Sequence, residues 1–191
     1  MEIRSFLAFE LPPEIKSAVA RVSDSLRKSG LDARWVKVEN IHLTIVFMGN
    51  TNTDHIHAIG HDVKKICSQY GSFDISIKGM GCFPNSRRPR VLWVGLDGDL
   101  ERMAQFRDDL QDRLKPFGIK VEKRKFKPHL TLGRFRSSRK TDSRLDEALT
   151  SHGVLNSPFF PLNELILFKS DLKPSGAVHT KLEAWPLLGD K

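Results

Sequence analysis

The chain has 191 residues, 39% hydrophobic and 28% charged, a composition typical of a soluble globular domain. No stretch approaches the roughly 18 consecutive apolar residues of a membrane-spanning helix, which excludes an integral helical membrane protein. Lysine and arginine number 31 against 23 aspartate and glutamate, and the net charge of +8 favours a polyanionic partner.

Hydrophobic periodicity divides the chain into strands, where apolar residues alternate, and helices, where they recur every three or four residues. The first half is predicted to run strand, helix, strand, helix, strand, at residues 3–10, 13–27, 41–48, 56–67 and 73–77. The second half repeats this order at residues 91–96, 100–114, 129–135, 142–150 and 162–168. A last extended segment, residues 178–187, is expected to join one of the sheets.

The repeated order indicates an internal duplication. His42 and His129 are 129 − 42 = 87 positions apart, and the same shift carries the first predicted strand and helix onto their counterparts. We therefore predict one α+β domain that is bilobal and internally duplicated, with pseudo-repeats at about residues 1–86 and 88–175. Two antiparallel sheets are expected to face a central cleft, with the helices on the outside.

Each repeat carries His-Leu-Thr followed by an aliphatic residue on its middle strand. Side chains two positions apart on a strand share a face, so His42 and Thr44 point one way while Leu43 points into the core. His129 and Thr131 form the same pair in the second repeat. If the two faces oppose each other, two imidazoles and two hydroxyls converge on one cavity.

This set of groups suits displacement at a phosphodiester. One neutral imidazole can accept a proton from water while an imidazolium donates one to the departing oxygen, because the unperturbed pKa of histidine is about 6.5. The threonine hydroxyls can donate hydrogen bonds to the non-bridging phosphate oxygens. One such motif is a weak signal, but two copies at equivalent positions are a strong one. The repeat is nearly symmetric, so the residues alone do not distinguish acid from base.

Beyond these motifs, the chain resembles the RNA 2′,3′-cyclic phosphodiesterase family, formerly called 2′-5′ RNA ligase, of the two-histidine phosphoesterase superfamily. The similar segments are RSFLAFELPPEIK, ARWVKVENIHLTIVFMGN, RPRVLWVGL, FKPHLTLGRF and LILFKSDLKPSGAVHTKLEAWPL. They cover nearly the whole chain, and residues 53–72 are the least similar. The resemblance implies hydrolysis of RNA 2′,3′-cyclic phosphate ends to 2′-phosphomonoesters, and we expect no metal ion and no cofactor.

The resemblance also implies a role for individual residues. His42 would protonate the leaving 3′ oxygen, and His129 would act as general base toward water. Thr44 and Thr131 would hold the phosphate, and Arg134 would supply a cation beside it.

Two arguments disagree about the position of Arg134. The resemblance implies that it lies beside the phosphate, whereas strand alternation places it on the other face. It lies five residues after His129, and strict strand alternation places residues at odd offsets on opposite faces. A bulge or twist at Gly133 would be needed to bring Arg134 onto the side of the histidine.

Other histidines and aromatic residues receive structural interpretations. If their segment is helical, His57 and His61 lie about 40° apart but face away from the apolar stripe, which favours a solvated surface over a metal site. His179 is expected to be structural, with the rim of the cleft within its reach. Phe47 and Trp93 could stack a base, but strand aromatics more often belong to the core.

The expected partners are RNA ends or nucleotides that carry a 2′,3′-cyclic phosphate, with no membrane partner and a monomeric state. Basic residues concentrate at 87–90, 120–127 and 134–140. Cys67 and Cys82 lack metal-ligand spacing and no secretory signal is recognised, so we expect a cytoplasmic protein.

Two alternatives stay open. The first is reversible 2′-5′ RNA ligation, which uses the same histidines in reverse. The second is a non-catalytic module that binds RNA ends on a basic cleft. The intact histidine pair favours an enzyme, because simple binding needs cations more than titratable imidazoles.

Overall fold

The computed structural model describes residues 1–136, 143–152, 155–174 and 176–191. The helices are α1 (Pro13–Lys28), α2 (Ile56–Cys67), α3 (Leu100–Leu114) and α4 (Ser143–Ser151). The strands are β1 (Glu2–Glu10), β2 (Ala33–Trp35), β3 (His42–Asn52), β4 (Phe73–Phe83), β5 (Val91–Gly98), β6 (His129–Phe135), β7 (Phe160–Leu162), β8 (Glu164–Lys173) and β9 (Gly176–Pro186). The predicted elements are confirmed apart from residue 142, the expected start of the fourth helix, which lies outside the described residues, as do residues 137–140 of one basic segment.

The strands form one antiparallel sheet in the order β7-β4-β5-β6-β3-β1-β8-β9, with β2 paired to β6. Among the described residues, β3 and β6 pair only at Leu43 and Leu130. The sheet therefore consists of two parts joined at one residue pair. We name β3, β1, β8 and β9 the first half-sheet, and β7, β4, β5, β6 and β2 the second half-sheet. The α+β class with antiparallel strands is confirmed, and the two expected sheets are continuous through this pair.

The half-sheets do not follow the two halves of the sequence. A shift of 87 residues carries β1, α1, β3, α2 and β4 onto β5, α3, β6, α4 and β8 in order. However, β4 pairs with β5, and β8 pairs with β1. Each half-sheet thus combines strands from both halves of the chain. The first contains β1 and β3 with β8 and β9, and the second contains β5, β6 and β7 with β2 and β4.

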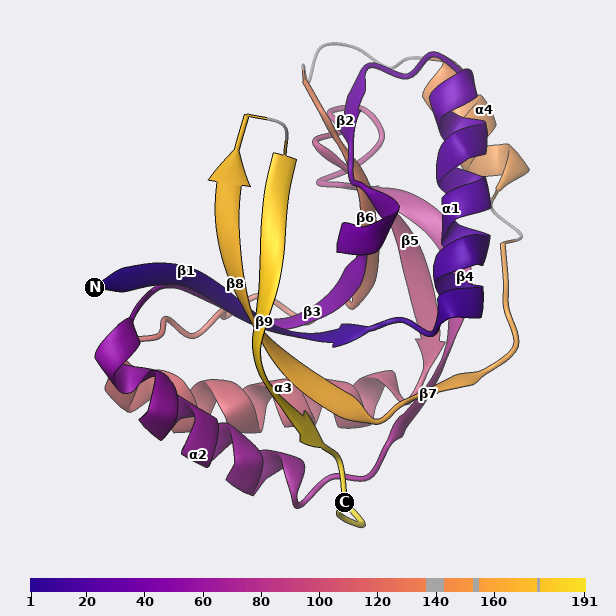
Figure 1. The fold of residues 1–191 in the computed structure, drawn as a ribbon. Helices are drawn as coiled ribbons and strands as arrows, with labels where there is room; N and C mark the ends of the chain where they lie inside the picture. The colour runs from indigo at the N-terminus through magenta and orange to yellow at the C-terminus, as the bar shows by residue number, and fades with distance from the viewer. Residues whose placement is uncertain (137–142, 153–154, 175) are drawn as a thin grey trace.

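The helices also pair across the two halves of the sequence. In Figure 1, α2 and α3 lie side by side beneath the first half-sheet, and α1 and α4 lie together along the second. Nη1 of Arg144 in α4 donates to the carbonyl of Gly30, just after α1, at 2.9 Å. No helix in the part of the chain that the structure describes combines the length and hydropathy of a membrane span.

The first half-sheet buries side chains on both faces. Leu7 and Phe9 join the main core against the helices. A separate buried cluster lies on the opposite face, since neighbours along a strand alternate, and its members are Phe6, Ala8, Ile166 and Phe168. This second face is the one that carries the histidine motif of β3.

Candidate functional site

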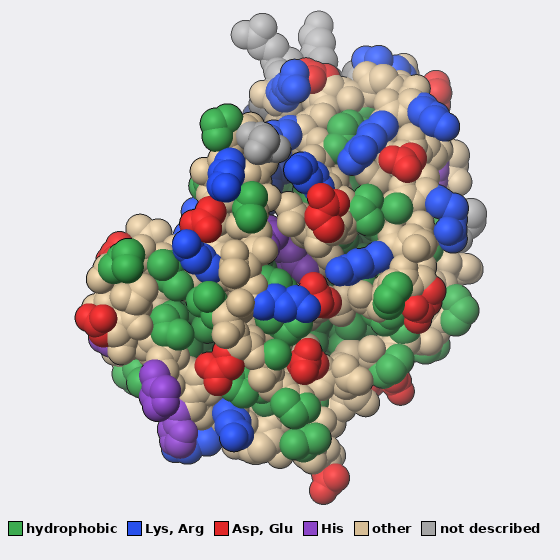
Figure 2. Space-filling view, in the orientation of Figure 1, with side chains coloured by type: hydrophobic (Ala, Val, Ile, Leu, Met, Phe, Trp, Pro, Cys, Tyr) green, Lys and Arg blue, Asp and Glu red, His purple; other side chains and the backbone are tan. Residues whose placement is uncertain are grey.

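The two His-Leu-Thr motifs meet where the half-sheets join. Leu43 and Leu130 stand opposite each other and are both 0% exposed, whereas the histidine and threonine on either side of each leucine are half-buried. The burial pattern therefore follows the predicted alternation in both strands. Figure 2 shows histidine side chains at the bottom of a hollow in the middle of the molecule, with lysine and arginine side chains around it.

The antiparallel register arranges the four polar side chains as a quadrilateral. Since 42 + 131 = 43 + 130, His42 stands across from Thr131, and Thr44 stands across from His129. The two histidines are diagonal neighbours, and in a regular ladder such residues are about 7–8 Å apart, with a somewhat shorter distance between their Cβ atoms. The register thus places two imidazoles and two hydroxyls around one point of the sheet, which is the arrangement that a phosphate between the rings would need.

Both imidazoles are held in the same tautomer. Nδ1 of His42 lies 2.7 Å from the carbonyl oxygen of Asn40, and Nδ1 of His129 lies 2.7 Å from that of Lys127. A carbonyl oxygen only accepts, so Nδ1 carries the proton in each ring, and in the neutral imidazole Nε2 has the lone pair. Each acceptor stands two residues before its histidine, so the repeat duplicates the orienting bond together with the motif.

His42 is enclosed by rings on the first half-sheet. Its imidazole stacks on Phe6 with 4.7 Å between ring centroids, and the His179 ring meets it edge-on at 5.3 Å. Burial lowers the pKa of His42 to about 4, although the hydrogen bond to Asn40 opposes the shift. The charges of His179 and Lys16 act in the same direction as burial. With this pKa the His42 ring of the free protein is neutral at neutral pH.

His129 has a comparable environment on the second half-sheet. Phe83 meets its ring edge-on at 4.9 Å, and Trp93 lies 6.4 Å away. Burial lowers the pKa of His129, the bond to Lys127 opposes the shift, and the charge of Arg134 adds to it. Arg134 is therefore close enough to His129 to influence its ionisation.

A β-bulge in β6 determines where Arg134 lies. Gly133 and Thr131 pair with consecutive residues of β5, so Leu132 between them has no partner on that strand. Leu132 and Gly133 are both buried, and the extra residue returns the exposed Arg134 to the face of Thr131. Strict alternation is wrong here because the bulge at Gly133 resets the order of faces.

The same bulge occurs in β3. Val46 and Thr44 pair with consecutive residues of β1, so Ile45 between them has no partner on that strand. Ile45 corresponds to Leu132 of β6, since 132 − 87 = 45. Phe47 therefore takes the place in β3 that an arginine has in β6. It is 51% exposed, and the guanidinium of Arg4 lies 4.6 Å from its ring centre. The expectation that Phe47 belongs to the core is wrong.

Arg34 is a second cation beside Arg134 that sequence reasoning missed. The two residues pair directly across β2 and β6, and both are exposed. Like charges directly opposite each other destabilise a sheet, so an anion between them would be favoured. β2 has only three residues, and its pairing is not visible in the periodicity.

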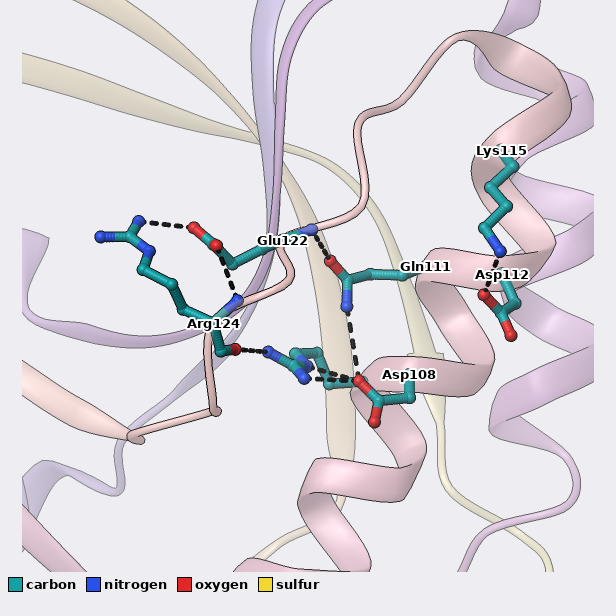
Figure 3. Close-up of polar contacts among 7 residues, drawn as sticks. Asp108, Gln111, Asp112, Lys115, Glu122 and Arg124 are labelled. Atoms are coloured by element: carbon teal, nitrogen blue, oxygen red, sulfur yellow. Dashed lines mark hydrogen bonds and ion pairs between the residues drawn. The ribbon is translucent and has the colours of Figure 1, made fainter.

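The segment that leads into His129 is anchored to α3 (Figure 3). The side-chain oxygen of Gln111 accepts from the backbone N–H of Glu122 at 2.7 Å. Arg107, only 8% exposed, donates to the carbonyl of Arg124 at 3.3 Å. These bonds fix the backbone shortly before the carbonyl that orients His129.

The remaining candidates lie in different places. His57 and His61 lie on α2, and Trp93 and His179 flank the two motif histidines. His179 is thus at the site, and its neighbour Phe6 is another contact that strand patterns alone did not indicate. Within the described residues no three His, Cys, Asp or Glu side chains gather as metal ligands would.

Known proteins resemble the chain over most or nearly all of its length. RNA 2′,3′-cyclic phosphodiesterase of Methanothermobacter thermautotrophicus is 31% identical over 187 residues, covering 98% of this chain and 100% of the relative. The Thermotoga maritima protein of the same name is 33% identical over 132 residues, covering 69% of this chain and 70% of the relative.

Solved structures share the fold of this chain, and a family model matches most of its length. A Thermus thermophilus crystal structure matches with a TM-score of 0.81 at 24% identity, covering 99% of this chain and 100% of that one. E. coli LigT complexed with 3′-AMP matches with a TM-score of 0.75 at 23% identity, covering 98% and 99%. The model of the 2′-5′ RNA ligase superfamily matches residues 11–174. This chain belongs to the 2′-5′ RNA ligase superfamily.

Proposed function

We propose that the protein hydrolyses 2′,3′-cyclic phosphates at RNA 3′ ends to 2′-phosphomonoesters. The observation that carries the proposal is the register at Leu43 and Leu130, which gathers two imidazoles and two hydroxyls on one face. The curated relatives named RNA 2′,3′-cyclic phosphodiesterase support the same reaction. Among the described residues, neither motif histidine has a hydrogen bond at Nε2, and two such histidines match a reaction that moves one proton from water and one to a ribose oxygen.

The roles follow from the reaction that the family performs. His129 accepts a proton from the attacking water, which forms the new bond to phosphorus. His42 donates a proton to the 3′ oxygen as its bond to phosphorus breaks. Thr44 and Thr131 donate hydrogen bonds to the non-bridging oxygens, and Arg134 adds positive charge beside them.

His42 must take up from solvent the proton that it donates, and substrate binding favours this uptake. Burial holds the pKa of this imidazole at about 4 in the free protein. A phosphate anion within hydrogen-bond distance favours the charged form of the ring and raises that pKa. The acid is therefore formed in the complex with the substrate.

The test is turnover of adenosine 2′,3′-cyclic phosphate in excess EDTA, with the products separated by chromatography. The expected product is the 2′-phosphate, and His42→Ala or His129→Ala should each lower kcat by about 100-fold or more. Matched variants of surface histidines, His57→Ala and His61→Ala, should keep full activity. Full activity in either motif variant would show that the imidazoles do not catalyse the reaction.

Ligation is a second candidate, because the matching family model carries the description 2′-5′ RNA ligase. Ligation uses a 5′ hydroxyl in place of water as the nucleophile: the new bond joins its oxygen to phosphorus, the bond to the 3′ oxygen breaks, and the same two protons are transferred. Incubating one RNA with a 2′,3′-cyclic phosphate end and one with a 5′ hydroxyl end measures it. A joined product that resists a 3′-5′-specific nuclease identifies the new linkage.

We also propose a monomer in the cytoplasm, made of pseudo-repeats at about residues 1–86 and 88–175. Cys67 and Cys82 are both free thiols, and burial raises the pKa of the first to about 12 and of the second to about 11. Free, protonated thiols fit a reducing compartment. The shift of 87 residues between corresponding elements supports the two repeats.

A further inference from the structure

The cleft side of the first half-sheet has an apolar floor beside His42. Phe6, Ala8, Ile166 and Phe168 form the buried cluster that is separate from the main core. The rings of Phe6 and Phe168 stack with 5.2 Å between centroids, and the His42 ring lies 6.1 Å from Phe168. His42 thus stands at the border of an aromatic surface.

A pocket of about 170 Å³ opens at this border. His42 is part of its wall, together with the rings of Phe168 and His179. Its polar lining consists of Glu10, Glu39, Asn40 and Lys181. Nδ1 of His179 is buried and has no hydrogen-bond partner among the residues that the structure describes, so it is one more polar atom that a ligand could satisfy.

An ion pair forms the polar end of the pocket. Nζ of Lys181 donates to Oε2 of Glu10 at 2.5 Å, and Nζ of Lys16 lies 3.7 Å from Oε1. A carboxylate has about four acceptor positions, so Glu10 can accept further hydrogen bonds. Stacking rings, an acceptor and a donor are the groups that recognise a nucleobase.

The corresponding region of the second half-sheet is filled by an indole. A Cβ atom on Gly81 would lie 2.4 Å from the Trp93 ring, and one on Gly95 would lie 3.3 Å from it. The ring therefore covers the backbone of β4 and β5 beside His129. The ion pair itself is matched here, since Asp97 stands 97 − 10 = 87 residues after Glu10 and bonds to Lys78 at 2.5 Å.

We propose that the pocket on the first half-sheet binds the base of the 3′-terminal nucleoside, an inference that rests on the proposed function. In an in-line displacement the attacking and departing oxygens lie on opposite sides of phosphorus. His42 protonates the departing 3′ oxygen, so the ribose and its base lie on the side of the pocket, and the water lies on the side that Trp93 fills.

The polar end of the pocket gives this site a base preference. The base stacks on His179 and Phe168, and its edge reaches Glu10. A carboxylate accepts hydrogen bonds from the amino group of cytosine, whereas uracil presents a carbonyl oxygen at the same position. The pocket therefore favours cytidine over uridine, two nucleosides of nearly equal size.

The experiment compares kcat/KM of the full-length protein for three compounds: cytidine 2′,3′-cyclic phosphate, its uridine counterpart, and 1-O-methylribose 2,3-cyclic phosphate, which has no base. We expect cytidine to exceed uridine by about 10-fold, and the compound without a base to be slower than cytidine by about 10-fold or more. Equal rates for the three compounds would overturn the proposal while leaving the hydrolase function intact.

Two matched variants locate the base. Glu10→Gln should bring the ratio of cytidine to uridine close to 1, and Asp97→Asn, the equivalent change on the second half-sheet, should leave the ratio unchanged. The opposite result would place the nucleoside beside His129 and overturn the proposal. A general loss of stability does not alter this ratio, so the readout does not depend on how well each variant folds.

A binding experiment separates this inference from the proposed function. If the protein hydrolyses none of the three compounds, calorimetric titration with 2′-CMP and 2′-UMP measures the affinity of the pocket for each base without turnover. Tighter binding of 2′-CMP that Glu10→Gln abolishes would support the base pocket even then. Equal binding of the two nucleotides would overturn it.

Discussion

At the scale of single residues, the two histidines are oriented alike but differ in their surroundings. Both donate Nδ1–H to a carbonyl two residues earlier. His42 faces Phe6 and His179, whereas His129 faces Phe83 and Trp93. The duplicated motif orients both imidazoles in the same way, and the unlike neighbours make the two sides of the site different.

The first prediction at this scale concerns the pH dependence of kcat/KM, which reports the pKa values of the free enzyme. The base must be neutral and the acid protonated, so the rate falls on either side of the two values. Burial lowers the pKa of both imidazoles, and the maximum should lie between pH 4 and 6.5. A maximum above pH 7 would show that the rings are not held in their neutral form.

The second residue-scale prediction concerns stability. The pKa of His42 is about 4 in the folded protein against 6.5 for an unperturbed ring, so the unfolded chain binds more protons between these values. The free energy of unfolding should therefore fall as pH drops through this window, by roughly 3 kcal/mol from His42 alone.

The matching variant is His42→Phe, which keeps a ring against Phe6 and removes the titrating group. Urea unfolding at several pH values from 4 upward should show a smaller acid loss in the variant than in the parent. His129 and His179 remain in both proteins and contribute equally. Parallel curves over the whole range would contradict a buried neutral His42.

At the scale of elements, irregular segments decide which side chains reach the site. A bulge in β6 brings Arg134 to the face of the histidine, and the bulge in β3 does the same for Phe47. Periodicity predicts both strands correctly, but a bulge depends on pairing with a neighbour and is not visible in one strand alone.

The prediction at this scale concerns the segment before His129 that α3 anchors. Arg107→Met keeps much of the buried side-chain volume and removes the donors that hold the carbonyl of Arg124. We expect kcat to fall by about 10-fold with a small change in KM, because small displacements of a catalytic group are costly. Amide exchange in residues 118–127 should become faster.

The control for this variant is on the same helix. Arg113 on α3 pairs with Asp62 on α2 at 2.9 Å, and its side chain is 47% exposed. Arg113→Met should change neither kcat nor amide exchange in residues 118–127. Equal effects of the two variants would show that α3 acts through general stability and not through the anchored segment.

At the scale of the whole molecule, the exchange of strands makes the two halves of the chain dependent on each other. The first half-sheet takes β8 from the second half of the sequence, and the second half-sheet takes β4 from the first. The helix pairs are mixed in the same way. Neither half of the sequence therefore contains a complete sheet with its own helical cover.

This arrangement predicts how separate fragments behave. Fragments of residues 1–87 and 88–191 should each lack a cooperative unfolding transition by circular dichroism. Mixed after refolding together, they should recover one transition, and with it hydrolysis of a 2′,3′-cyclic phosphate. A cooperative transition in fragment 1–87 alone would contradict the mutual dependence of the two halves.

The sequence by itself determined the order of elements, their recurrence at a spacing of 87 residues, and the two motifs with histidine and threonine on one face. These features depend on spacing along a single strand or helix, which local periodicity records. Pairing between distant strands is not recorded in this way. Only the tertiary structure decided that the halves exchange strands, that Arg34 stands beside Arg134, and that His179 and Glu10 line a pocket at His42, because each of these depends on contacts between residues far apart in the chain.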